Sequence, residues 1–208
     1  CGGKRFRKEK DIMDVWFDSG STHASVLEEH GLPWPCDLYI EGADQYRGWF
    51  QSSLLTAVAT RGQSPYKNCC SCGWVVDGEG RKMSKSLKNG TAPEKIIEQY
   101  GADILRLWVA SSDYHSDVRI SFEYLKQLSD GYRKIRNTAR YILGNLGDFD
   151  PDAHRVAFEE LHDIDKWAVA SCQQLIKEVR KAYEDFEFHN IYHAIHNFCS
   201  VDMSSFYL

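Results

Sequence analysis

The pattern of hydrophobic and polar residues divides the chain into two parts. Up to residue 121, short apolar runs end at clusters of Gly, Asp, Ser or Pro, which is typical of strands that lead into loops and helices. Ile12–Phe17, Leu38–Ile40 and Trp74–Val76 predict three such strands because they are rich in β-branched and aromatic residues. From residue 122 on, apolar residues recur every three or four positions, as in amphipathic helices. We therefore predict an α/β part over 1–121, followed by an all-α part over 122–208.

Two of the predicted strands end in polar loops that are each followed by a helix. After the second strand, Asp44 is the candidate N-cap of a helix whose apolar positions begin at Trp49. After the third strand, a glycine-rich loop leads to a helix beginning at Pro93, with Thr91 as the candidate cap. Ligand contacts in α/β folds lie where strands end, so we expect both loops at one edge of a single sheet.

The second part predicts an up-and-down helical bundle. A first helix carries an apolar seam that steps by three and four: Leu125, Leu128, Tyr132, Ile135, Ala139, Ile142 and Leu146. Gly147–Pro151 interrupts this pattern, and two further helical patterns run over 164–186 and 191–201. We expect this bundle to be incomplete at its C-terminal edge.

Composition restricts the classes of function. The 208 residues are 43% hydrophobic and carry a formal net charge of −5, which argues against a generally basic nucleic-acid-binding protein. No apolar run reaches transmembrane length and no leader opens the chain, so we expect a cytoplasmic protein with no membrane partner. A local basic row, Arg133, Arg136 and Arg140, could follow an RNA backbone. The alternatives are a solvated face or salt bridges to the acidic stretches 159–163 and 184–187.

Seven cysteines without secretory signals favour reduced thiols. The cluster Cys69, Cys70 and Cys72, alone or with Cys1, suggests a metal site. Adjacent cysteines form an awkward tetrahedral set, however, and a second Cys-x-x-Cys is missing. We expect no zinc within this chain.

The clearest candidate for chemistry is the segment Asp77–Asn89, which we call the lysine loop. Two glycines at its entry allow positive φ, and Lys82 and Lys85 follow three residues apart. In a tight turn both ammonium groups lie on one side, where they suit a polyphosphate whose charge grows during a reaction. Ser84 and Ser86 add hydroxyl donors. The alternative is a solvated basic turn.

A second candidate site follows the second predicted strand. Glu41, Asp44 and Gln45 supply acceptors and an amide, and Gly42 allows the backbone to approach a ligand closely. The ammonium group of an amino acid and the hydroxyls of a ribose both need such partners. The alternative is an ordinary capped helix with solvent-facing acids.

Several motifs together resemble the isoleucyl-tRNA synthetases, a family of class I aminoacyl-tRNA synthetases. The resemblance covers nearly the whole chain. It rests on Asp14–Gly20 (DVWFDSG), Glu41–Phe50 (EGADQYRGWF), Lys82–Ser86 (KMSKS), Gly101–Trp108 (GADILRLW), Tyr132–Thr138 (YRKIRNT) and elements of 198–207. The pairing of the first two motifs favours isoleucine over the near alternatives, valyl- and leucyl-tRNA synthetases.

The resemblance implies the C-terminal part of a Rossmann-type catalytic domain with a connecting segment, and then a helical anticodon-binding domain. It implies activation of L-isoleucine by ATP with Mg²⁺, transfer to tRNA(Ile), and a monomeric full-length enzyme. The matching motifs imply an isoleucine pocket at Trp16 and Trp49. They imply an aminoacyl-adenylate site at Glu41, Gly42, Asp44 and Gln45. They also imply that Lys82 and Lys85 are catalytic, within an ATP site formed by Lys82, Ser84, Lys85 and Ser86. Lys85 is the expected direct contact to ATP.

The chain departs from the family pattern at several points. The nucleotide motif of the His-Ile-Gly-His type and the editing domain are expected outside residues 1–208, so we expect this chain alone to be inactive. Lys88 stands where Gly is usual, Cys72 where His is usual, and Tyr46 where His is frequent. These three differences from the family pattern affect the geometry that we expect for the ATP site. A non-catalytic RNA-binding module derived from a synthetase is the alternative from another functional class.

Overall fold

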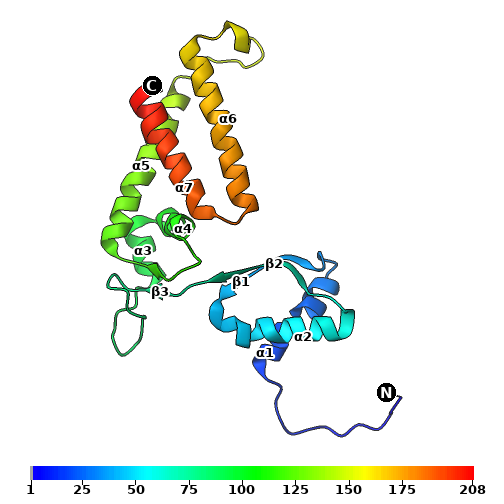
Figure 1. Ribbon diagram of the computed structural model, residues 1–208. Coiled ribbons are helices and arrows are strands. Elements are labelled where there is room, and N and C mark those ends of the chain that lie inside the picture. Colours follow the sequence, from blue (N-terminus) through cyan, green and yellow to red (C-terminus); the bar gives the residue numbers. More distant parts are fainter. Residues whose placement is uncertain (1) are drawn as a thin grey trace. The chain divides into compact units, whose positions relative to one another are not determined.

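The computed structural model describes residues 2–208 (Figure 1). These residues form two compact units, one up to Gly73 and one from Trp74 to Leu208. Each unit has its own helices and its own two-stranded parallel sheet.

The first unit contains two strands and several short helices. Its elements are α1 (Val15–Gly20), the π-helical turn η1 (His23–Glu28), β1 (Cys36–Gly42), the 3₁₀ turn η2 (Ala43–Arg47), α2 (Trp49–Arg61) and β2 (Tyr66–Cys72). β1 and β2 pair in parallel, with Leu38 opposite Asn68 and Gly42 opposite Cys72. The strand predicted at 38–40 is confirmed. β2 was not predicted as a strand of its own, since its polar residues and three cysteines mask the usual apolar signal.

The strand predicted over Ile12–Phe17 is wrong, because helix α1 begins at Val15. Asp14 caps this helix: its Oδ1 accepts a hydrogen bond of 2.8 Å from the backbone N–H of Trp16. The side chains of Val15, Trp16 and Phe17 are exposed. The Asp14 cap therefore favours a helix over the strand expected from the β-propensity of these residues. Burial in this unit does not oppose it, because the three side chains are exposed.

Helix α2 is confirmed, but Asp44 is not its N-cap. Gly48 occupies that position, and Asp44 lies in the preceding turn η2. The buried side of the helix consists of Phe50, Ser53 and Ala57, whereas Leu55 and Val58 are exposed. Where α1 approaches α2 closely, at Ser52 and Ser53, the residues of α2 are small. A Cβ atom built on Gly20 would lie 2.6 Å from Ser52 Cβ and 2.8 Å from the Ser53 backbone nitrogen.

The second unit is mostly helical. It contains β3 (Val75–Val76), α3 (Pro93–Tyr100), α4 (Ala102–Ser111), β4 (Val118–Arg119), α5 (Phe122–Gly144), the 3₁₀ turn η3 (Phe158–Glu160), α6 (Asp163–Glu184), α7 (Phe188–Asn197) and its π-helical continuation η4 (Phe198–Tyr207). Helix α3 begins at Pro93 as predicted. Its N-cap is Ala92, without a side-chain hydrogen bond, so the cap assigned to Thr91 is wrong.

The two candidate loops do not follow strands of one sheet, contrary to prediction. β3 pairs in parallel with β4, while β1 pairs with β2. Val118–Arg119 supplies β4, and Asp117 accepts a hydrogen bond of 2.8 Å from the Trp74 N–H. Strand partners far apart in sequence are chosen by tertiary packing, which a run of three apolar residues does not specify.

The lysine loop is attached to the hydrophobic core of the second unit. That core consists of Ile96, Ile104, Trp108, Ile120, Leu125 and Leu128, and the partly buried side chain of Met83 packs against it. The indole N–H of Trp108 donates to the carbonyl of Arg119 at 3.3 Å, which joins α4 to β4. The core therefore connects the loop, both strands and the first turns of α5.

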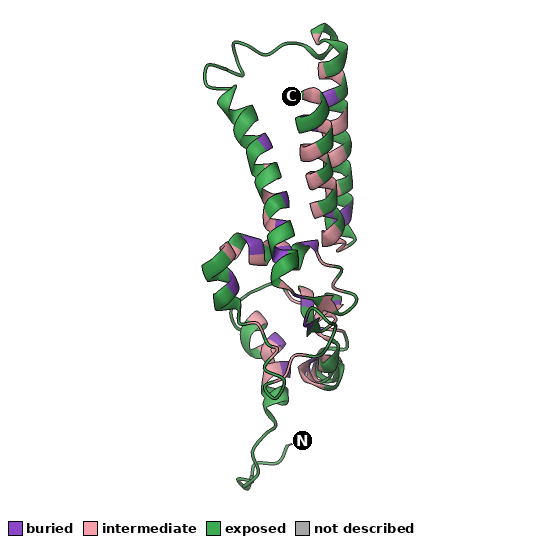
Figure 2. Cartoon of the chain, turned by 90° about the vertical axis from the view of Figure 1, so that its left-hand side faces the viewer, coloured by how far each residue is buried: buried purple, intermediate pink, exposed green. Residues whose placement is uncertain are grey.

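The helices α5, α6 and α7 lie side by side, and η4 packs on both α5 and α6 (Figure 1). Buried residues are confined to one side of α5 (Figure 2). The predicted seam is buried at Leu125 and Leu128, but Ile142 and Leu146 are exposed. Between residues 2 and 208, no helix combines the length and the apolar character needed to cross a membrane.

The close approach of α1 to α2 leads to a prediction about stability. Gly20→Ala places a methyl group against backbone and Cβ atoms that cannot simply rotate away. We expect it to lower the free energy of unfolding by about 1–3 kcal/mol, measured by denaturant unfolding. Gly144→Ala is the matched control, since a Cβ there meets no atom within 4 Å. Equal stability of the two variants would contradict the packing described.

Candidate functional site

The lysine loop is organised around the carboxylate of Asp77, which is buried although the four residues that follow it, Gly78 to Arg81, are exposed. Its Oδ1 accepts from the backbone N–H groups of Glu79 (3.1 Å) and Arg81 (2.8 Å). Its Oδ2 accepts from Arg81 Nε (2.9 Å) and Asn89 Nδ2 (2.8 Å). The bonds from Asn89 and Arg81 hold the pKa of this carboxyl far below its usual range. Asp77 is therefore ionised in the folded loop near neutral pH, and its two oxygens accept four hydrogen bonds within the protein.

The two lysines differ in their surroundings. Lys82 Nζ lies 4.7 Å from the ring centroid of Trp74, a cation–π contact. Lys85 is exposed, and no ion pair involving it occurs within residues 2–208. Ser84 Oγ and Ser86 Oγ lie 3.1 Å apart. All four predicted ATP-site residues therefore lie in one turn. The Lys82 ammonium group contacts Trp74, whereas the Lys85 ammonium group is available to a ligand.

Lys88 has a left-handed backbone, with φ of 51°. A side chain in this region costs about 1–2 kcal/mol because Cβ approaches the following carbonyl oxygen. The position that the family resemblance marked as usually Gly therefore has the conformation that favours Gly.

The second candidate site lies at the end of β1. Glu41 pairs with Ser71 in the sheet, and Gly42 precedes the turn η2. A Cβ on Gly42 would lie 2.8 Å from Asp44 Oδ1, so only Gly lets this carboxylate fold back toward the strand. Gln45 Nε2 donates to Asp44 Oδ2 at 3.3 Å, and Gln45 Oε1 accepts from the Trp49 N–H at 3.4 Å. Glu41, Gly42, Asp44 and Gln45 lie together at the end of β1, with both carboxylates exposed.

The two predicted pocket tryptophans come from helices that pack against each other, α1 and α2. Trp49 is half-buried, with its ring centroid 4.8 Å from that of Tyr39 and 4.6 Å from that of Phe50. Tyr39 is fixed in turn by a 2.9 Å hydrogen bond between its hydroxyl and Ser53. Trp16 is 45% exposed. An aromatic cluster therefore positions Trp49, and Trp16 presents its ring to solvent within this unit.

The cysteine cluster lies on β2, where alternation directs Cys69 to the face opposite Cys70 and Cys72. Burial raises the pKa of the Cys69 and Cys72 thiols. Over residues 2–208, no three His, Cys, Asp or Glu side chains are grouped so as to hold a metal ion. The possible contribution of Cys1 lies outside the described residues.

The basic row on α5 is exposed to solvent. Arg133 forms an ion pair with Asp130 on its own helix. Arg133 and Arg136 line an open pocket of about 390 Å³ beside the first turn of α4. The acidic residues Asp185 and Glu187 pair instead with Lys181 and His189. Within the described chain, the row is therefore not neutralised by the acidic stretches named above.

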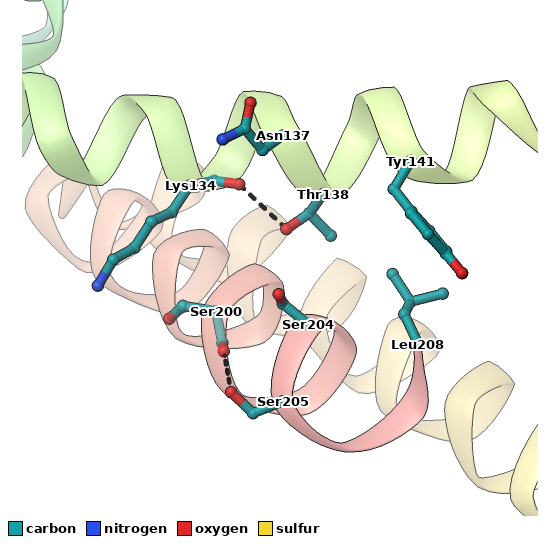
Figure 3. A pocket seen from close by; sticks show the side chains of 8 residues that line it. All are labelled: Lys134, Asn137, Thr138, Tyr141, Ser200, Ser204, Ser205 and Leu208. Carbon is teal, nitrogen blue, oxygen red and sulfur yellow. Dashed lines mark hydrogen bonds between the residues drawn. The ribbon is translucent and has the colours of Figure 1, made fainter.

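The neighbouring stripe of α5 faces a different pocket, of about 560 Å³ (Figure 3). Lys134, Asn137, Thr138 and Tyr141 line it from α5, and Ser200, Ser204, Ser205 and Leu208 from η4. Thr138 and Ser205 donate their hydroxyl hydrogens to the carbonyls of Lys134 and Ser200. Each of these bonds lies within a single helix. Thr138 Oγ1 also lies 3.2 Å from the Cys199 carbonyl and so joins α5 to η4, which makes the pocket part of the packing between these helices.

Sequence reasoning missed three residues that shape the lysine loop: Asp77, Asn89 and Trp74. The two glycines at the loop entry indicated a backbone that can take positive φ, but gave no indication that the Asp77 carboxylate is buried. Asn89 was noted solely as the end of the segment. Trp74 was assigned to a strand, whereas its ring contacts Lys82. No sequence signal links Asp77 to Asn89, because their hydrogen bond depends on how the loop closes.

Comparison with known families gives two matches. A family model described as tRNA synthetases class I (I, L, M and V) matches residues 1–121. A second, described as the anticodon-binding domain of tRNA ligase, matches residues 165–208.

The chain also resembles curated proteins along its whole length. Isoleucine–tRNA ligases from Caldanaerobacter subterraneus subsp. tengcongensis and Natranaerobius thermophilus are each 62% identical to it over 209 aligned residues. The alignments cover 100% of this chain, which spans 22% and 23% of the length of these relatives.

Two solved structures share the fold at low sequence identity. The LeuRS of a LeuRS–tRNA–LeuAMS ternary complex from Agrobacterium radiobacter is 20% identical with a TM-score of 0.80, and the match covers 93% of this chain and 26% of that one. The methionyl-tRNA synthetase of Mycobacterium tuberculosis, solved with methionyl-adenylate, is 22% identical with a TM-score of 0.61, over 80% of this chain and 32% of that one. With the family model matching 121 residues, the chain belongs to the class I tRNA synthetases of the isoleucine, leucine, methionine and valine group.

Proposed function

We propose that this chain is part of an isoleucine–tRNA ligase, which activates L-isoleucine with ATP and transfers it to tRNA(Ile). The observation that carries this proposal is the 62% identity to isoleucine–tRNA ligases across the whole chain. The chain corresponds to under a quarter of those relatives' length. The activity is therefore proposed for the full-length protein, which we expect to be a cytoplasmic monomer.

Within that enzyme, residues 1–121 would be the C-terminal part of a Rossmann-type catalytic domain with its connecting segment. The parallel pairing of β1 with β2 and of β3 with β4 supports this assignment. Residues 122–208 would begin a helical anticodon-binding bundle. The packing of α6 on α7, and of η4 on α5 and α6, supports the second assignment.

Activation requires the carboxylate of isoleucine to attack the α-phosphorus of ATP, while the bond from that phosphorus to the pyrophosphate oxygen breaks. No protein nucleophile takes part, so positioning and electrostatics supply the rate enhancement. Glu41, Asp44 and Gln45 would hold the ammonium group and the adenylate, with Trp16 and Trp49 against the apolar side chain. Lys82 and Lys85 would stabilise the charge that develops on the phosphates.

Magnesium would enter as part of the ATP substrate. Of the two carboxylates in the lysine loop, Asp77 already accepts four hydrogen bonds and Glu79 is paired with Arg81. The lysines themselves therefore supply the positive charge that this loop brings to the phosphates.

The exposed lysine of the loop gives the first test of function. In the full-length enzyme, Lys85→Ala should lower isoleucine-dependent ATP–pyrophosphate exchange by about 10²–10³-fold, because a donor to the developing charge is lost. The thermal midpoint should be unchanged, since Lys85 makes no ion pair within residues 2–208. Lys177→Ala, at an exposed position of α6, is the control.

Normal exchange in the Lys85→Ala enzyme would contradict the assigned role. Comparison of isoleucine, valine and leucine as exchange substrates separates the proposed ligase from its near relatives. A full-length protein that exchanges with none of the three, but still binds tRNA, would favour the non-catalytic RNA-binding module.

The basic row of α5 gives a second prediction. If Arg136 contacts a tRNA phosphate, Arg136→Ala should weaken tRNA(Ile) binding and reduce the slope of log affinity against log salt by about 1. Arg180→Ala on α6 is the control for general loss of positive charge. Filter binding over a range of salt concentrations measures both slopes. An unchanged slope for Arg136→Ala would assign this side chain to a solvated face.

A further inference from the structure

The side chain of Asn89 joins the end of the lysine loop to its beginning and its middle. Asn89 Oδ1 accepts a hydrogen bond of 2.9 Å from the Ser84 N–H. Asn89 Nδ2 donates to Asp77 Oδ2 at 2.8 Å and to the Lys82 carbonyl at 3.3 Å. One amide group therefore contacts three separate points of the loop with both its oxygen and its nitrogen.

Asp77 determines the orientation of that amide. A carboxylate accepts but does not donate, so the NH₂ group of Asn89 must face Asp77 and its oxygen must face the Ser84 N–H. Arg81 and two backbone N–H groups hold the carboxylate from the other side. Asp77 is buried, which excludes most of the water that would otherwise compete for these bonds.

The rest of the loop divides into an anchored and an exposed part. Met83 packs against the hydrophobic core. Its neighbours in sequence, Lys82 and Ser84, both form hydrogen bonds with the Asn89 side chain. Residues 85–88 are exposed, and Lys85 is among them. Asn89 then returns the chain to the anchored part.

We propose that Asp77 and Asn89 are positioning residues for the two lysines. Their side-chain pair fixes the backbone at Lys82 and Ser84, and so defines the path from which Lys85 reaches the phosphates. Neither residue contacts the reacting atoms in this role. This inference rests on the proposed function of the lysine loop and adds to it the residues that hold the loop in shape.

The substitution Asn89→Ala removes all three contacts. Because the lysines stabilise charge that develops during the reaction, the loss should appear in kcat. We expect kcat for isoleucine-dependent exchange in the full-length enzyme to fall about tenfold to a hundredfold, with KM for ATP changed less than about twofold. Trypsin, which cuts after Lys and Arg, should cleave the loosened loop several times faster.

The decisive variant reverses the pair. Asn89→Asp alone places two carboxylates against each other, and Asp77→Asn alone leaves two amides with a poorly matched contact. In the double variant Asp77→Asn/Asn89→Asp, an amide at 77 can again donate to a carboxylate at 89, which can still accept from Ser84. The bonds from position 89 to the Lys82 carbonyl and from Arg81 Nε to position 77 are not restored, so the recovery is partial. We expect kcat to recover about fivefold or more relative to either single variant.

The control is Glu79→Gln, which removes an exposed charge paired with Arg81 in the same turn and leaves the Asp77–Asn89 bond intact. Its kcat should match that of the wild type. If Asn89→Ala lowers the thermal midpoint of the whole protein, the reversed pair decides the question alone.

Wild-type kcat in a folded Asn89→Ala enzyme, or a reversed pair no more active than the single variants, would overturn the inference. Failure of the proposed function is distinguishable, because the wild-type full-length protein would then show no isoleucine-dependent exchange. In that case, loop cleavage by trypsin still tests whether the pair holds the loop.

Discussion

The hydrogen bonds received by one buried carboxylate organise the segment that carries the lysines. Asp77 accepts from two backbone N–H groups, from Arg81 and from Asn89, and thereby shapes a loop that has neither helical nor sheet hydrogen bonds along most of its length. A carboxylate with four donors cannot leave its place without exposing unpaired partners. These hydrogen bonds therefore fix the backbone of the loop, even though its lysine side chains are exposed.

The position of that base follows from the packing around it. Met83 is attached to the core of α3, α4 and α5, and the short pairing of β3 with β4 holds the entry. The lysines can consequently differ in role although they are three residues apart. Lys82 rests on Trp74 beside the anchored part, and Lys85 extends from the exposed part. A loop built this way can offer a mobile cation to a ligand without losing the geometry of its own backbone.

A different constraint acts at the end of β1. There the important residues are small: Gly20 allows α1 to reach α2, and Gly42 leaves room for Asp44 to fold back. Aromatic contacts around Tyr39 and the hydrogen bond to Ser53 then fix the helix that carries Trp49. The backbone that carries Glu41 and Asp44 is thus closely packed, while the two carboxylates, which we propose to hold an amino acid, remain exposed.

The sequence by itself determined the local elements and the chemistry they carry. The periodicity beyond residue 121 predicted the long helices, Pro93 marked the start of α3, and the motifs around Glu41 and Lys82 identified both candidate sites and the family. These features are encoded by neighbouring residues, so a linear pattern reveals them. Tertiary structure alone decided that β1 and β3 belong to different sheets and that Asp77 meets Asn89. Each of these depends on which distant segments become neighbours, and burial and hydrogen-bond pairing settle that choice only when the whole chain is packed.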